Sequence, residues 1–221
     1  MKKRIFLALL VVTLAAGGAF AQVSFGIGGF VGGDFGGGVE MSASAGGITA
    51  KGGIKMPYFG GGGYVFLDAQ FVELTFGLYG GKMDYKGYTE VNGTYNETNA
   101  VTFSISNFNI GLFGKIPTDL GALTVFPMLG IDYAMTTALK DENGNEANDA
   151  GDLSALWIKA GGGLDLGLGG NLFLRAEALY GIRFANKIEN DLKDGMTVPG
   201  ADTRTRLGHG LDIKLAIGFR L

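Results

Sequence analysis

Apolar and polar residues alternate along most of this 221-residue chain. Residues 172–184 show the pattern most clearly, because every second side chain from Leu172 to Phe184 is apolar, while Arg175, Glu177 and Arg183 lie between them. Successive side chains of a β-strand point to opposite faces of its sheet. The segment therefore predicts a strand with one apolar face and one charged face.

The glycine-rich residues 23–66 predict one long β-hairpin. Apolar residues fall on odd positions before Gly46-Gly47 and on even positions after it, and both glycines tolerate the positive φ of a two-residue turn. The apolar face of the returning strand is then made of Ile48, Ala50, Ile54, Met56, Tyr58, Tyr64 and Phe66. This register pairs Ala45 with Ile48, Val39 with Ile54 and Phe35 with Tyr58, and it sets Tyr64 opposite Gly29.

Six further alternating segments follow, at residues 71–83, 101–116, 123–133, 156–166, 172–184 and 207–221. Asn92-Gly93 and Asn143-Gly144 are the expected turns of two hairpins, the second of which pairs Ile131 with Leu156 and sets Trp157 opposite Gly130. The alternation changes parity within residues 101–116, which predicts a β-bulge near Ser106-Asn107. Long polar connections, including residues 186–206, alternate with short ones, so we expect eight strands, or ten if a loop contains a further pair.

The polar face of these strands carries charges of both signs in equal number. Its members are Glu73, Asp132, Asp165, Glu177, Asp212, Lys159, Arg175, Arg183, Lys214 and Arg220. In a soluble β-sandwich these side chains would face water and the apolar faces would share a core. In a membrane barrel the apolar face meets lipid and the charges pair inside, since paired buried charge is tolerated where isolated charge is not. The short and long connections favour the barrel, and the balanced charges predict a plugged interior.

The first 21 residues predict a secretory signal peptide. A basic start, Lys2 to Arg4, precedes an apolar run and a small-residue cleavage site at Ala19 and Ala21, so the mature domain is residues 22–221. Removing the basic start leaves 15 basic residues against 21 acidic ones, a net charge of about −6 that argues against binding nucleic acid. The mature chain has no apolar run long enough for a transmembrane helix and no cysteine.

The signal peptide, the eight alternating segments, the long loops and the apolar-alternating C-terminus together resemble the small outer-membrane barrels of the OmpA/OmpX/OmpW type. The resemblance implies an all-β, closed antiparallel up-and-down barrel in a bacterial-type outer membrane, with short periplasmic turns, long extracellular loops and both mature termini in the periplasm. It also implies outer-membrane lipid, the barrel assembly machinery and periplasmic chaperones as partners. That family typically ends in an aromatic residue, whereas this chain offers Phe219 and Leu221 as its C-terminal assembly signal.

Other candidate sites are weak. Asp141, Asn143, Asn145, Asp149 and Asp152 have spacings similar to a calcium loop, but Glu146 stands where the sharp turn needs glycine. Some small barrels modify lipids with a serine, histidine and acid, and His209 is the only histidine here, yet its parity puts it on the apolar face. We therefore expect no cofactor and no catalytic residue.

These patterns predict a non-enzymatic barrel that acts through its extracellular loops, in envelope integrity, adhesion or the binding of an extracellular ligand. A narrow, porin-like channel for small solutes of the OmpW type is the alternative, and a lipid-modifying enzyme is a remote one.

Overall fold

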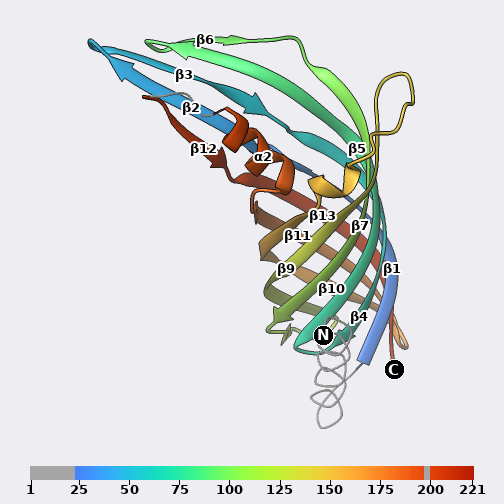
Figure 1. The fold of residues 1–221 in the computed structure, drawn as a ribbon. Helices are drawn as coiled ribbons and strands as arrows, with labels where there is room; N and C mark the ends of the chain where they lie inside the picture. The colour runs from blue at the N-terminus through green and yellow to red at the C-terminus, as the bar shows by residue number, and fades with distance from the viewer. Residues whose placement is uncertain (1–22, 197–199) are drawn as a thin grey trace, which may run out of the picture.

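A computed structural model describes residues 23–196 and 200–221. Eight strands form a closed ring in which each is antiparallel to its neighbours, and the last pairs with the first (Figure 1). They are β1 (Val23–Asp34), β4 (Tyr58–Ala69), β5 (Val72–Val91), β7 (Val101–Lys115), β9 (Leu123–Lys140), β10 (Ala155–Gly169), β11 (Leu172–Arg183) and β13 (Gly208–Arg220). The predicted eight-stranded antiparallel barrel is confirmed.

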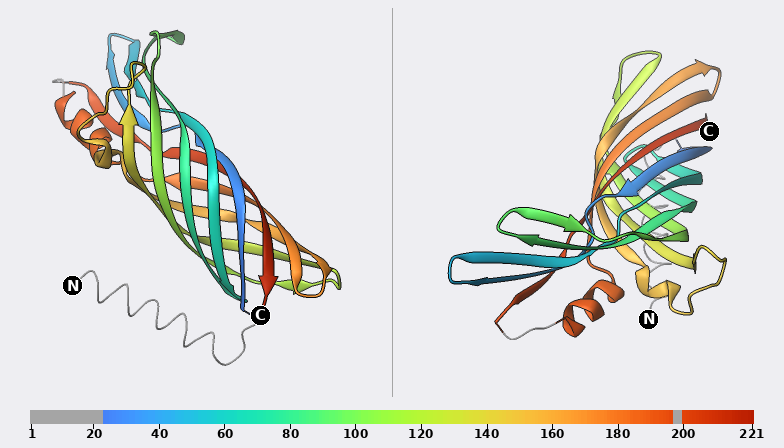
Figure 2. Two further views of the ribbon diagram at one scale, coloured as in Figure 1. Left: turned by 90° about the vertical axis from the view of Figure 1, so that its right-hand side faces the viewer. Right: turned by 90° about the horizontal axis from the view of Figure 1, so that it is seen from above.

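The connections differ between the two ends of the barrel (Figure 2). At the turn end, short links with positive φ at Gln70, Gly169 and Gly170 join the strands, and the short strand β8 (Thr118–Asp119) pairs with β9. β1 begins and β13 ends at this same end. The other end, here called the loop end, carries every long connection.

A second sheet extends the barrel at the loop end. Its order is β12–β2–β3–β5–β6, in which the upper part of β5 joins β2 (Gly38–Ala45), β3 (Ile48–Lys55), β6 (Thr94–Glu97) and β12 (Asp202–Arg206). Figure 1 shows this sheet leaning to one side, with the helix α2 (Lys187–Gly195) and the 3-10 helix η1 (Ala150–Leu153) beneath it.

The prediction of a plain loop over residues 186–206 is wrong, because this segment contains α2 and β12. The helix begins at a capping box: Asn186 accepts a bond from the backbone N–H of Glu189, and the Glu189 carboxylate accepts one from the backbone N–H of Asn186. Among the described residues, no helix is long and apolar enough to cross a membrane.

The two faces of the ring have opposite polarity. Large apolar side chains point outward on every barrel strand, with Ile27, Leu78 and Leu129 more than 60% exposed. Inside, the charged Arg175 and Glu73 and the aromatic Phe113 and Phe173 are all fully buried. The alternation in the sequence is therefore apolar outside and polar or aromatic inside.

The register of the first hairpin is predicted correctly only in its distal half. β2 and β3 pair Ala45 with Ile48 as expected, whereas β1 and β4 pair Asp34 with Tyr58 and Gly28 with Tyr64, so the expected pairs with Phe35 and Gly29 are wrong. The segment between β1 and β2 is one residue longer than the segment between β3 and β4, and this extra residue shifts the register. As a result, Tyr64 and Phe66 point into the barrel, and the outward residues of β4 are Phe59, Val65 and Leu67.

Two further register predictions are corrected. The pairing of β7 with β9 does shift between Ser106 and Asn107. The pairing of β7 with β5 is regular, however, so the alternation along β7 does not change parity. As a result, Ile105 and Asn107 share the interior face. β9 and β10 pair Ile131 with Ile158, which sets Trp157 opposite Asp132. This shift of two residues leaves the predicted faces unchanged, because side chains alternate with a period of two.

Interior glycines make room for interior aromatic rings. A Cβ added at Gly26, Gly163 or Gly218 would collide with the ring of Phe66, Phe126 or Phe173, respectively. An eight-stranded barrel is barely wide enough for its own side chains, so each large ring needs a bare stretch of neighbouring strand.

We therefore expect Gly218→Val to lower the free energy of unfolding by about 1–3 kcal/mol, since it forces the Phe173 ring out of its position. Gly114→Val is the matched control, because a Cβ there meets nothing closer than 3.8 Å and points outward. Urea unfolding of both variants in lipid vesicles measures the difference. Equal stability of the two variants would show that the ring and the glycine are not coupled.

Candidate functional site

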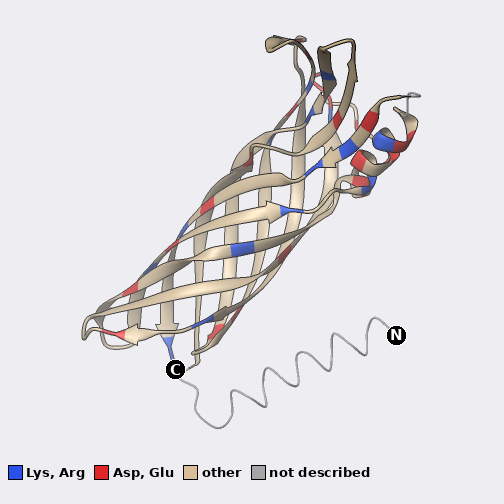
Figure 3. Ribbon diagram, turned by 90° about the vertical axis from the view of Figure 1, so that its left-hand side faces the viewer, with Lys and Arg blue, Asp and Glu red and all other residues tan. Residues whose placement is uncertain are grey.

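Charged residues occur along the whole height of the barrel strands (Figure 3), and those that point inward form three layers. In the layer nearest the turn end, the Arg175 guanidinium contacts three carboxylates. Its Nη2 lies 2.6 Å from Asp68 Oδ2, its Nη1 lies 2.5 Å from Glu73 Oε2, and its Nε lies 2.7 Å from Asp165 Oδ1. The Phe66 ring centroid is 4.3 Å from the guanidinium carbon, so the cation is held by both charge and a ring face.

Two lysines complete this Arg175 layer. Lys115 contacts the Asp68 carboxylate and lies 3.8 Å from Glu73. Lys214 lies 3.5 Å from Glu177, whose other oxygen is 3.9 Å from Arg175. Neither Glu177 oxygen has a hydrogen-bond donor among the described residues, so this carboxylate is the most weakly held of the layer.

The middle layer consists of Lys159 between two aspartates. Its Nζ lies 2.5 Å from Asp132 Oδ2 and 2.5 Å from Asp212 Oδ2, which joins β9, β10 and β13 across the interior. The Trp157 ring centroid lies 5.3 Å from the same ammonium.

The third layer ties the barrel wall to the loops. The Arg183 Nε lies 2.5 Å from Asp34 Oδ2, and its two Nη atoms bond both oxygens of Glu189 at 2.7 and 2.8 Å. Asp34 also accepts bonds from the backbone N–H groups of Gly36 and His209. Arg183 thus holds the first turn of α2 against β1 and β11.

Nine of the ten residues predicted for the interior lie in these three layers. The tenth, Arg220, lies at the turn end with its guanidinium 5.0 Å from the Phe173 ring, and no described carboxylate lies within salt-bridge distance. The sequence prediction missed Asp34, Asp68, Lys115 and Glu189. Alternation places Asp34 and Lys115 on the polar face. Asp68 was missed because the strand was predicted to end at residue 66, whereas β4 continues to Ala69, and Glu189 was missed because it lies in the unpredicted helix.

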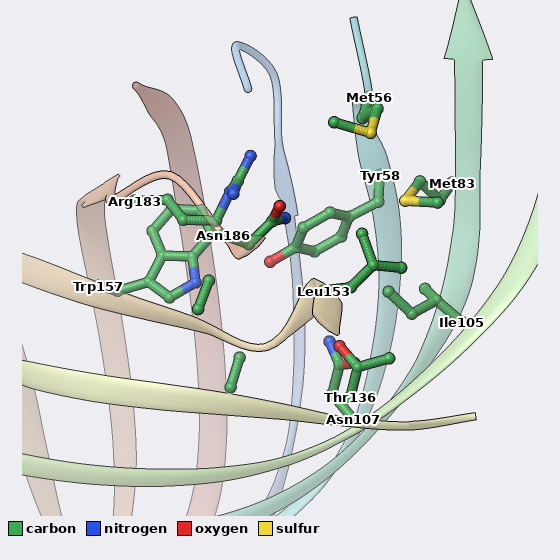
Figure 4. A pocket seen from close by; sticks show the side chains of 12 residues that line it. Met56, Tyr58, Met83, Ile105, Asn107, Thr136, Leu153, Trp157, Arg183 and Asn186 are labelled. Carbon is green, nitrogen blue, oxygen red and sulfur yellow. The ribbon is translucent and has the colours of Figure 1, made fainter. Parts of the chain in front are cut away.

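A small apolar cavity borders the third layer, since Arg183 is one of its lining residues (Figure 4). Its volume is about 20 Å³, room for roughly one water molecule. Met56, Met83, Ile105, Leu153 and Trp157 line it together with polar groups of Asn107, Thr136, Arg183 and Asn186. η1 supplies Leu153, and Ile188 and Leu192 of α2 pack against the same apolar cluster.

A second, polar cavity of about 170 Å³ opens at the turn end. Asp68, Lys115, Asp165 and Arg220 are among its lining residues. Because Asp68 and Asp165 are also partners of Arg175, this cavity ends at the Arg175 layer. The polar cavity thus borders the Arg175 layer, and the apolar cavity borders the third layer.

The sheet at the loop end has its own charge cluster around Glu40. Its carboxylate accepts bonds from Arg204 at 2.5 Å and from the Tyr88 hydroxyl at 2.9 Å. Burial raises the pKa of Glu40, but the bonds from Arg204 and Tyr88 outweigh it, and the net pKa is below the usual glutamate value. The cluster joins β2, β5 and β12 and is strongest when Glu40 is ionised.

The calcium candidates fall into two groups. Asp141 accepts bonds from the side-chain amide of Asn145 and from the backbone N–H groups of Asn145 and Asn143, which lower the pKa of its carboxyl. Asp152 pairs with Lys187 at 2.5 Å, and Asp149 precedes η1. Over residues 23–196 and 200–221, no three acidic, histidine or cysteine side chains are arranged to hold a metal ion.

The remaining predicted residues lie at the ends of the chain or on the exterior. His209 is exposed, and its Nδ1 lies 2.8 Å from the Tyr180 hydroxyl. The Phe219 ring packs 5.9 Å from that of Phe25, and the backbone N–H of Leu221 bonds to Val23. Ala19 and Ala21 lie outside the described residues.

We expect Arg175→Met to destabilise the barrel by about 3–5 kcal/mol, because it leaves three buried carboxylates without their cation. Arg220→Met is the control, since Arg220 loses only its contact with the Phe173 ring. Urea unfolding in vesicles at neutral pH compares them. If both variants unfold at the same urea concentration as the parent, water inside the barrel solvates these charges.

No family model matches the chain, and no curated protein matches it in sequence. Among solved structures, it is similar to the outer membrane protein OprG from Pseudomonas aeruginosa, with 10% identity, a TM-score of 0.44 and coverage of 93% of this chain and 98% of OprG. It is also similar to the translocator domain of the autotransporter NalP from Neisseria meningitidis, with 13% identity, a TM-score of 0.25 and coverage of 100% and 96%. The strand pairings, rather than these likenesses, establish the closed barrel.

Proposed function

We propose that this protein is a non-enzymatic outer-membrane β-barrel that is closed to solutes and acts through its sheet at the loop end, in envelope integrity or in contacts with extracellular ligands. The turn end would then face the periplasm, together with both mature termini.

The exterior of the ring supports the membrane placement. An unbroken apolar surface surrounds the ring, and the closed ring leaves no strand edge to be desolvated in lipid. Exposed aromatic residues lie at both ends of this surface, with Phe25 and Phe71 at the turn end and Phe35, Phe59 and Tyr180 at the loop end. Aromatic belts at both interfaces are typical of transmembrane barrels.

The contacts of the Arg175 layer are the main support for a closed interior. A side chain with no exposed surface contacts carboxylates from β4, β5 and β10, so it bridges the barrel from wall to wall. Three aromatic rings surround the guanidinium, with centroids 4.3 to 5.3 Å from its central carbon. Passage of a solute would require this layer to separate.

A narrow channel of the OmpW type is the second candidate. The observation in its favour is the pair of cavities, one polar at the turn end and one apolar at the loop end, because together they shorten the plug that a solute must pass. The enzymatic alternative has less support, since the hydrogen-bond partner of the His209 side chain is Tyr180 rather than a serine or an acid.

We expect the purified mature chain to give no steady current above the lipid background in planar bilayers. Insertion is first checked by gel mobility, since a folded barrel shifts on boiling. Arg175→Ala/Glu73→Ala removes one cation and one carboxylate together from the layer that closes the interior, and we expect this variant to pass measurable current because the Arg175 layer is then open. Steady current through the parent protein would instead support the channel.

A further inference from the structure

A group of cations lies on the outside of the protein, at the boundary between the barrel and the loop-end sheet. We call Lys55, Lys82, Lys86 and Arg206 the exterior cation cluster. Odd positions of β5 from Glu73 to Met83 point into the barrel, so Lys82 and Lys86 point outward. Lys82 pairs with Phe59, whose ring is exposed on the same outer surface.

Three members of the cluster share one row across the sheet. Arg206 pairs with Gly38, Gly38 with Lys55, and Lys55 with Lys86. Neighbouring strands are about 4.8 Å apart, so the two lysines are direct neighbours on one face. Like charges directly opposite each other destabilise a sheet unless an anion lies between them.

The protein supplies little negative charge to this row. Lys55 donates to the Tyr95 hydroxyl at 2.6 Å and Lys82 to Ser104 at 3.0 Å, and in the described chain neither has a carboxylate within salt-bridge distance. Lys86 lies 3.5 Å from Asp84. Arg206 lies 3.8 Å from Glu40, whose shorter bonds go to Arg204. The row is therefore cationic in a protein whose net charge is −3.

The height of the cluster matches the headgroup region of a membrane. On β5 the outward residues are apolar up to Leu78, which is 68% exposed, and Lys82 is the first outward charge beyond it. With about 3.3 Å per residue and a tilt near 40°, Lys82 and Lys86 lie roughly 10 Å apart along the membrane normal. The polar zone of one leaflet is about 5–8 Å thick, and lysine side chains reach several ångströms further.

We propose that the exterior cation cluster binds the phosphate of an outer-leaflet lipid headgroup, with Lys55, Lys86 and Arg206 around the phosphate and Lys82 below it. Acyl chains of the same lipid would lie along the exposed Phe59 and its apolar neighbours. The inference goes beyond the proposed function but rests on its membrane placement.

Spin-labelled lipids test this in vesicles of phosphatidylcholine that contain the full mature chain. The measured quantity is the association of spin-labelled phosphatidic acid, which carries a phosphate monoester, relative to spin-labelled phosphatidylcholine. We expect a clear preference for phosphatidic acid, which weakens as salt is raised. Lys55→Gln and Lys86→Gln should each reduce it by about fivefold, and the double variant should abolish it.

Lys51→Gln is the matched control, because Lys51 lies on the same face nearer the hairpin tip and 4.0 Å from Glu90. It should leave the preference unchanged. Equal association of the two lipids with the parent protein, or an equal loss in the control, would overturn the proposal. Displacement by millimolar inorganic phosphate would also overturn it, since the ligand would then be a soluble anion. Failure to insert, seen as no mobility shift on boiling, would instead overturn the membrane placement and this inference with it.

Discussion

Closure of the strand ring is the constraint on which the rest of the structure depends. Every backbone N–H and C=O group of a segment in lipid needs a partner, and a sheet provides this for all its strands only when the last pairs with the first. Here β13 pairs with β1 over eleven successive residues, from Ser24 to Asp34. Once eight strands are closed, the interior is narrow and its contents must fit side chain by side chain.

Glycines, aromatic rings and shared ion pairs together allow the side chains to fit the narrow interior. Bare stretches of strand receive Phe66, Phe126 and Phe173, and these rings surround the one guanidinium that three carboxylates share. Burying so many charges is tolerable because most of the buried cations contact two or three carboxylates, as Lys115, Lys159, Arg175 and Arg183 do. The same arrangement is the basis for the closed lumen that we propose, because the side chains that stabilise the barrel also fill its interior.

Alternation alone predicts the ring, the outward faces of most strands and nine of the interior charges, because a period of two is insensitive to shifts of two residues. It fails where one residue is inserted. The extra residue between β1 and β2 turns Tyr64, Phe66 and Asp68 inward, and the sequence contains no signal for it because glycines occupy the region. α2 escaped prediction because its polar residues resemble a loop, although Asn186 and Glu189 are spaced as a capping box.

β5 shows why polarity along a single strand is informative. In its lower half the inward residues are polar or aromatic, such as Glu73 and Tyr79, and the outward ones are apolar. In its upper half the assignment reverses, since Met83 faces inward and Lys82 and Lys86 face outward. Under the membrane placement that we propose, the medium around β5 changes from hydrocarbon to water between Leu78 and Lys82, which accounts for both halves of the strand. The membrane surface would then lie at the exterior cation cluster.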